Sequence, residues 1–164
     1  MKFKKALPLC ILITLLVIAL DHLTKYLIRV NMSLGQAIPS PDSFFSIRYT
    51  LNDGVAFSML EGHRIPLILM QSVLVVCIIV LMCYLLRKIN SRCLLVAFSF
   101  MLGGGIGNLI DRIVFGQVTD FLSAGKFPVF NLADTFLTIG CALMLLWVIL
   151  SEKRHKADET DEPA

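Results

Sequence analysis

The sequence has little charge for its length. Only 16% of its 164 residues are Asp, Glu, Lys or Arg, whereas soluble proteins average about 25%. A hydrophobic share of 57% excludes an intrinsically disordered chain and argues against a water-soluble globular domain. A soluble nucleic-acid-binding protein would gather basic residues on one exposed face, so we expect no nucleic acid partner.

The sequence also lacks the motifs of several common kinds of site. It contains no HExxH zinc motif and no Walker sequence for phosphate binding, and its three histidines are scattered. The five cysteines are odd in number, form no CxxC pair and lie in or beside apolar runs. They are typical of small buried hydrophobic residues rather than a disulfide framework, and we expect neither a metal site nor a cofactor.

Long apolar runs dominate what is present. A membrane-spanning helix needs about 20 mostly apolar residues. Four runs meet this requirement, and they predict spans at about 6–28, 66–86, 93–112 and 132–150. The predicted fold class is an all-α integral membrane protein, with residues 1–164 as a single membrane domain. The first run could also be a cleavable signal peptide, but no small-x-small cleavage site follows Leu20, which favours a retained helix.

The distribution of Lys and Arg predicts the orientation in the membrane. These residues are concentrated before the first span, between the second and third spans, and in the tail 151–164. The positive-inside rule therefore places both termini in the cytoplasm, and the connections at about 30–65 and 113–130 outside. In the first of these outer loops, residues 44–51 are rich in aromatic and β-branched side chains and precede an Asn-Asp-Gly turn. This pattern predicts a small β-element on the outer membrane surface.

Polar residues occur at the outer ends of the spans and in the outer loops. Because odd spans end outside and even spans begin there, these side chains are expected to converge on one leaflet. Polar groups within a membrane are costly and usually functional. The set comprises Asp21, Lys25, Asn52, Asn108, Asp111, Arg112, Asp120, Asn131 and Asp134.

Several of these residues also have a purely structural interpretation. Asp21 and Lys25 are spaced i,i+4 and can form an ion pair on one helix face. Asn131 and Asp134 have the spacing of a helix N-cap with an acidic third residue. The glycines within 103–107 are typical of close helix packing in membranes.

The balance of charge in this set indicates a type of chemistry. Four carboxylates share the outer region with Lys25 and Arg112, so two carboxylates remain without a cation. Two such carboxylates in close contact share a proton and can activate water for peptide hydrolysis. Three alternatives stay open: a proton-relay or transport subunit, a metal-dependent lipid head-group enzyme that uses the aspartates as ligands, and a noncatalytic assembly protein.

Five short motifs occur in an order and spacing that resemble one family. They are DHLTK at 21–25, NDGVAF at 52–57, GGGIGNLIDR at 103–112, VTDF at 118–121 and FNLAD at 130–134. Together they resemble the bacterial lipoprotein signal peptidase, signal peptidase II, over residues 21 to about 140. Small departures occur at Val55, Gly105 and Thr119, and none of them removes a polar group.

The resemblance implies an intramembrane aspartyl endopeptidase of the bacterial inner membrane, without a cofactor. Its substrates would be prolipoproteins in the membrane lipid, cut before a cysteine that already carries diacylglycerol. The family's catalytic pair carries over to Asp120 and Asp134. Substrate or site contacts carry over to Asn52, Gly54, Asn108, Arg112 and Asn131, and conformational support to Asp21, Lys25 and Asp111.

The resemblance also implies structural features outside the spans. The first outer loop would form a small β-cradle, with a short outer-facing helix in the same region. One chain contains the whole expected site, so a monomer suffices. Asp134 would lie on the first turn of the fourth span, where the positive helix end favours a charged carboxylate. We therefore expect Asp134 to act as the base and Asp120 as the acid.

Overall fold

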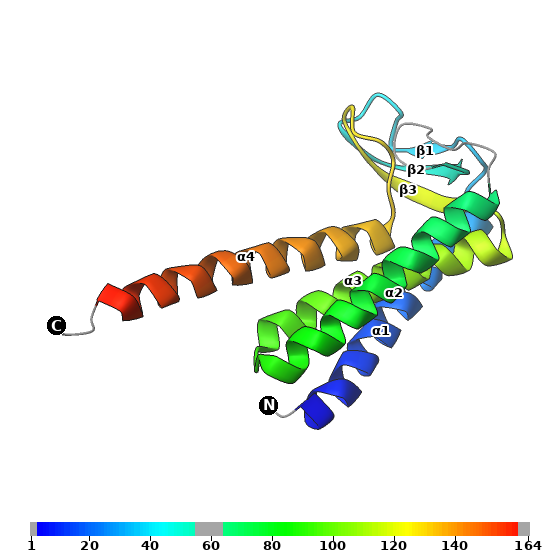
Figure 1. The fold of residues 1–164 in the computed structure, drawn as a ribbon. Coiled ribbons are helices and arrows are strands. Elements are labelled where there is room, and N and C mark those ends of the chain that lie inside the picture. Colours follow the sequence, from blue (N-terminus) through cyan, green and yellow to red (C-terminus); the bar gives the residue numbers. More distant parts are fainter. Residues whose placement is uncertain (1–2, 55–63, 161–164) are drawn as a thin grey trace.

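Four long helices and a small antiparallel sheet make up the structure (Figure 1). It is a computed structural model that describes residues 3–54 and 64–160. The helices are α1 (Phe3–Asn31), α2 (Arg64–Lys88), α3 (Arg92–Val114) and α4 (Leu132–Thr160). All four are long and apolar enough to cross a membrane, which confirms the predicted fold class. The helix α4 continues past its apolar stretch into the segment that was expected to be the tail.

Helix α3 is the central element of the helical layer. Of its apolar stretch, 61% is buried inside the protein, whereas the corresponding share in the other three helices is 11–22%. Its Leu94, Leu95 and Phe98 are almost completely buried and form a core with Val75 and Ile78 of α2. Many large apolar side chains of α1, α2 and α4 are exposed on the surface of the protein. An apolar outer surface of this kind is suited to contact with lipid.

Close approach of the helices depends on glycines in α3. A methyl group at Gly104 would collide with the carbonyl oxygen of Ala133 in α4, and one at Gly107 would lie 2.7 Å from Oδ2 of Asp21 in α1. The glycine-rich segment therefore permits tight packing of α1 and α4 against α3, as expected from the sequence. Helix α4 stays in contact with α3 as far as Leu143, whose carbonyl accepts a hydrogen bond from Cys93 Sγ at 3.6 Å. Its C-terminal end extends beyond the other helices (Figure 1).

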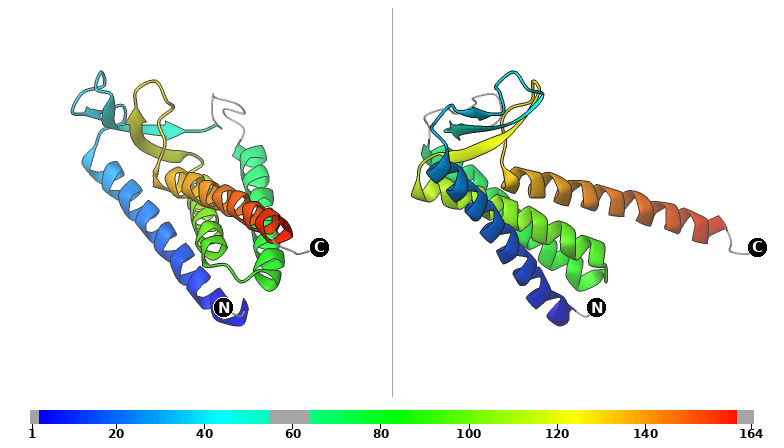
Figure 2. Two further views of the ribbon diagram at one scale, coloured as in Figure 1. Left: turned by 90° about the vertical axis from the view of Figure 1, so that its left-hand side faces the viewer. Right: turned by 180° about the vertical axis from the view of Figure 1, so that it is seen from behind.

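The sheet lies at one end of the helices, where α1 and α3 end and α2 and α4 begin (Figures 1 and 2). It contains β1 (Ala37–Ile38), β2 (Phe45–Asn52) and β3 (Val118–Ala124) in that order, with all pairs antiparallel. In the pairing of β2 with β3, Thr50 lies opposite Asp120. The sheet therefore holds one of the predicted carboxylates beside the helix ends.

The first two strands come from the loop that was expected to form a β-element, but β3 was not assigned from the sequence. It belongs to the second connection and pairs with β2 some 70 positions away in the chain. The short helix implied by the family resemblance has no counterpart in 32–54, and residues 55–63 lie outside the described part. All five cysteines are free; Cys10 is buried as expected, whereas Cys77 and Cys141 are exposed on outward apolar surfaces.

The close contact at Gly104 leads to a prediction about stability. We expect Gly104→Ala to lower the free energy of unfolding by about 1–3 kcal/mol, because backbone on α4 cannot yield as a side chain can. Gly105→Ala is the matched control, since its new methyl group would meet only a Val75 side-chain methyl at 3.2 Å. Thermal unfolding in detergent micelles measures both, and equal effects would contradict this account of the helix contact.

Candidate active site

A fully buried ammonium group connects the C-terminal ends of α1 and α3. Lys25 Nζ lies 2.7 Å from Oδ2 of Asp21 and 3.2 Å from Oδ2 of Asp111. Arg29 adds a second cation, with Nη2 2.9 Å from Oδ1 of Asp111. The i,i+4 ion pair expected on α1 is therefore present and belongs to a larger cluster. Two carboxylates and two cations balance in charge, as their burial requires.

The amide of Asn108 connects this charged cluster to α4. Lys25 Nζ donates to Oδ1 of Asn108 at 2.9 Å. The other end of the same amide, Nδ2, donates to Oδ1 of Asp134 at 2.7 Å. Asn108 thus links the ammonium of α1 to a carboxylate of α4 through an uncharged group.

A second amide, that of Asn131, contacts both remaining carboxylates. Its Nδ2 donates to Oδ1 of Asp120 at 2.7 Å and to Oδ1 of Asn108 at 3.0 Å. Its backbone N–H donates to Oδ2 of Asp134 at 3.2 Å. Asp120 and Asp134 therefore lie on either side of one residue.

Asp120 is a carboxyl group held by amides in a nearly dry environment. It is 3% exposed, and Asn52 Nδ2 donates to its Oδ2 at 2.9 Å. Burial raises the pKa of Asp120 to about 6, and the nearby charge of Asp134 adds to the effect. The hydrogen bonds from Asn52 and Asn131 favour the charged form and oppose this rise only in part. Asp120 can therefore hold a proton at a pH where an exposed aspartate cannot.

The start of α4 is capped by the same residues. Asp134 N donates to Oδ1 of Asn131 at 2.9 Å, which together with the return bond to Asp134 completes the capping box predicted from the spacing. Asp21 Oδ1 accepts the N–H of Ala133 at 2.9 Å. Two N–H groups of the first turn, which a helix leaves unpaired, are thus satisfied, and the backbone at Asp134 is fixed.

Arg112 connects α3 to the turn after β2 and to α2. Its Nη2 donates to the carbonyl of Gly54 at 3.0 Å, and its Nη1 donates to Oε1 of Gln71. Gly54 N in turn donates to Oδ1 of Asn52 at 3.0 Å. Because the hydrogen bond from Gly54 occupies Oδ1 of Asn52, the Nδ2 group of Asn52 faces Asp120. Adjacent residues of a helix do not face each other, so Arg112 cannot pair with its neighbour Asp111 and has these partners instead.

All ten residues named from the sequence belong to one connected network of hydrogen bonds and ion pairs. Further members were missed, among them Arg29, Gln71 and Thr119. Arg29 lies one turn after Lys25 on the same face of α1, and this i,i+4 spacing was the available signal. Gln71 is a polar residue in an otherwise apolar span. Within the described residues, no group of three His, Cys, Asp or Glu side chains could hold a metal ion.

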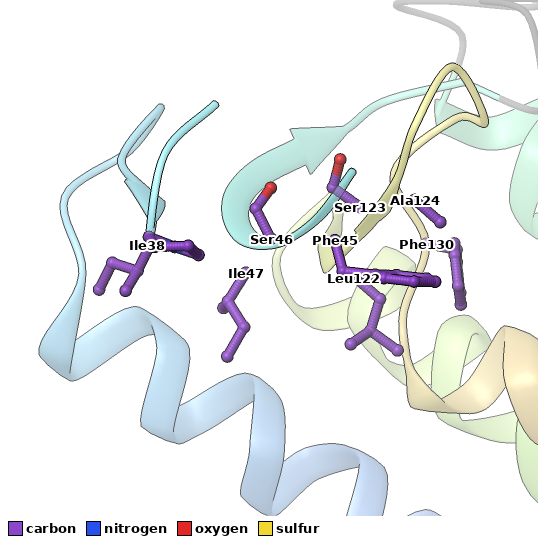
Figure 3. Close-up of a pocket in the computed structure, with 9 residues that line it drawn as sticks. Ile38, Phe45, Ser46, Ile47, Leu122, Ser123, Ala124 and Phe130 are labelled. Carbon is purple, nitrogen blue, oxygen red and sulfur yellow. The ribbon is translucent and has the colours of Figure 1, made fainter. Parts of the chain in front are cut away.

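An apolar pocket of about 400 Å³ adjoins the network on the side of the sheet (Figure 3). Leu122 and Phe130 form part of its wall, and they lie within two residues of Asp120 and Asn131 respectively. The complete lining is Ile38, Pro39, Phe45, Ser46, Ile47, Leu122, Ser123, Ala124 and Phe130. Apolar and polar surfaces that could contact one extended chain thus lie next to each other.

The Lys25 cluster leads to a prediction about stability. Lys25→Met leaves two buried carboxylates, Asp21 and Asp111, with Arg29 as their one remaining cation in the cluster. We expect the free energy of unfolding to fall by about 3–5 kcal/mol. Lys126→Met removes the same charge from an exposed side chain and should change it by less than about 0.5 kcal/mol. Chemical unfolding in micelles compares the two, and a Lys25→Met protein of normal stability would contradict this account.

Known proteins are similar to this chain in sequence and in fold. The model of the family described as signal peptidase (SPase) II matches residues 13–150. A protein of Listeria monocytogenes named lipoprotein signal peptidase is 42% identical over 151 residues, covering 88% of this chain and 96% of its own. One of the same name from Brevibacillus brevis is 42% identical over 147 residues, covering 88% and 97%.

Solved structures of bacterial membrane enzymes have the same fold. One matches with a TM-score of 0.75 at 29% identity and covers 96% of this chain and 94% of its own. Another matches with a TM-score of 0.74 at 31% identity and covers 86% and 92%. The family match and the identity over most of the chain confirm the resemblance found from the five motifs: the chain belongs to the signal peptidase II family.

Proposed function

We propose that the protein is an intramembrane aspartyl endopeptidase that removes signal peptides from diacylglyceryl-modified prolipoproteins. Asp120 and Asp134 form the catalytic pair, and cleavage takes place before the lipidated cysteine. Membership of the signal peptidase II family supports a peptidase, and the name of its relatives supports lipoprotein precursors as substrates. The catalytic pair is proposed from the geometry of the polar network.

One observation carries the assignment: the four carboxylates divide into two kinds. Asp21 and Asp111 are paired with Lys25 and Arg29. Asp120 and Asp134 form no ion pair within residues 3–54 and 64–160, and uncharged amides hold them instead. A carboxylate neutralised by a cation is a weak base, whereas one held by amides keeps its capacity to exchange protons.

The proposed reaction uses one proton shared by the pair. The charged carboxylate takes a proton from water, and the hydroxide so formed attacks the carbonyl carbon of the scissile peptide bond. The protonated carboxyl donates a hydrogen bond to the carbonyl oxygen and stabilises its developing charge. When the tetrahedral intermediate breaks down, the proton passes to the departing nitrogen, which leaves as the amine of the lipidated cysteine.

The roles within the pair follow from their surroundings. The raised pKa of Asp120 suits the protonated partner that polarises the carbonyl. Asp134 lies on the first turn of α4, where the positive end of the helix favours its charged form. We therefore assign Asp134 as the base and Asp120 as the acid.

The surroundings also suit a signal peptide. A membrane helix satisfies its backbone internally, so the cut segment has to unwind where polar partners replace the lost hydrogen bonds. Asn52, Asn108 and Asn131 can supply such partners without adding charge. The pocket beside Phe130 is lined by apolar side chains and can take the apolar residues that flank the cut. With both termini in the cytoplasm, this site lies at the outer leaflet.

The competing functions make different demands on the same residues. A proton-relay or transport subunit requires polar groups through the membrane depth, whereas the described network gathers at the sheet end of the helices. A metal-dependent head-group enzyme requires an added cation. A noncatalytic assembly protein requires neither carboxylate. The experiment below separates all three from the aspartyl peptidase.

Cleavage of a diacylglyceryl-modified proprotein in detergent tests the catalytic pair. We expect Asp120→Asn and Asp134→Asn each to lower kcat by about 10⁴-fold or more, since each removes a group that transfers the proton. Asp42→Asn is the matched control, because Asp42 is exposed in the first outer loop and should leave kcat unchanged.

Thermal unfolding shows that each variant is folded, and excess chelator is added to a parallel reaction with the unchanged enzyme. Near-normal activity in either dyad variant would refute the assignment and make Asp111 and Asp21 the next candidates. Loss of activity with chelator would support the metal-dependent reaction instead.

The raised pKa of Asp120 predicts the pH dependence of the reaction. Because Asp120 has to carry a proton, kcat/KM should fall as the pH rises above about 6, where the free enzyme loses that proton. Bound substrate excludes further water, so the corresponding fall in kcat should lie at higher pH. Initial rates from pH 4 to 9 measure both curves. A kcat/KM that keeps rising above pH 8 would contradict Asp120 as the acid.

A further inference from the structure

Arg29, near the C-terminal end of α1, contacts three side chains outside its own helix. Its Nε donates to Oγ1 of Thr119 in β3 at 2.7 Å, and its Nη2 donates to Oδ1 of Asp111 in α3 at 2.9 Å. The guanidinium carbon also lies 4.0 Å from the ring centre of Phe115, just beyond α3. A planar guanidinium with these three contacts fixes the directions of its neighbours as well as their charge.

The residue that Arg29 contacts in β3 is held from two sides. Thr119 is completely buried, its hydroxyl accepts from Arg29, and its backbone N–H donates to Oδ2 of Asp111 at 3.2 Å. The next residue is Asp120. Because side chains alternate across a strand, Thr119 and Asp120 point to opposite faces of β3. The Arg29 contact therefore lies behind the strand, away from the carboxyl group that faces Asn131.

Besides the Arg29 contact, β3 is held by its pairing with β2 and by backbone hydrogen bonds from Phe121 and Leu122 to Phe130. The pairing of β2 with β3 has an irregular register between Ile47 and Thr50, next to the pair that contains Asp120. A shift of the strand there would move the Asp120 carboxyl relative to Asp134, which is fixed by the cap of α4. The contact of Thr119 with Arg29 thus holds β3 close to the irregular part of its pairing with β2.

We propose that Arg29 is a positioning residue that acts through Thr119 to hold Asp120 at its working distance from Asp134. The inference rests on the proposed function, since it takes Asp120 to be half of the catalytic pair. Arg29 does not contact the reacting atoms. Its loss should lower the rate of the chemical step and leave substrate binding unchanged.

Thr119→Val is the mildest test, because it removes the hydroxyl and keeps the size, the backbone N–H and every ion pair. We expect kcat for the lipidated proprotein to fall about tenfold, with KM and the thermal midpoint unchanged. Thr24→Val is the matched control, since the Thr24 hydroxyl bonds only to carbonyls of its own helix. Unchanged kcat in Thr119→Val, or a fall explained by loss of folded protein, overturns the proposal.

A double-mutant cycle tests whether Arg29 acts through Thr119. Arg29→Lys keeps the charge beside Asp111 but replaces the planar guanidinium, which donates to Thr119 and Asp111 from two nitrogens, with one ammonium group. Its kcat should therefore fall about as much as that of Thr119→Val. In that background Thr119→Val should cost little more. If the fold-loss in kcat of the double variant equals the product of the two single losses, the two residues act separately, and the proposal is overturned.

Asp120→Asn in the same assay separates the two hypotheses. If Asp120→Asn is inactive while Thr119→Val has normal kcat, only the role of Arg29 is refuted. If Asp120→Asn is active, the proposed catalytic pair fails, and the role of Arg29 fails with it.

Discussion

The buried ammonium of Lys25 is the interaction on which the rest of the polar network depends. It can only donate hydrogen bonds, so the oxygens that face it have to accept. Its contact with Asn108 Oδ1 fixes the orientation of that amide, and Nδ2 is then directed at Asp134. One group thus neutralises carboxylates on α1 and α3 and also determines the hydrogen bonding of a carboxylate on α4 that it does not pair with.

The four carboxylates of the network differ in the type of group that contacts them. Cations surround Asp21 and Asp111, where the helices pack, and removing one would leave a buried charge uncompensated. Amides surround Asp120 and Asp134, the proposed catalytic pair. Neutral amides satisfy the carboxylate oxygens without holding them permanently ionised. This division explains how seven charged side chains can lie in one network at the end of an apolar helix bundle and still leave two carboxylates, within the described residues, outside any ion pair.

Sequence reasoning worked where one element contains the whole pattern. The i,i+4 spacing of Asp21 and Lys25 and the capping spacing of Asn131 and Asp134 are local, and both contacts occur. Strand β3 could not be assigned, because its seven residues gain their partner only from a strand far away in the chain. The contacts of Arg29 were missed for the same reason. Thr119, noted as a departure from the family pattern, is one end of such a long-range contact.

The fixed direction of the amides also limits where the shared proton can lie. Asn131 Oδ1 accepts from a backbone N–H, which cannot reverse, so its Nδ2 has to donate to Asp120. Asn52 Oδ1 likewise accepts from Gly54 N, and its Nδ2 has to donate to the other oxygen of Asp120. Each oxygen of Asp120 keeps one further lone pair, and a proton on it can point only to a group outside these amides. The capping and turn bonds that build the fold therefore direct a proton on Asp120 away from both amides.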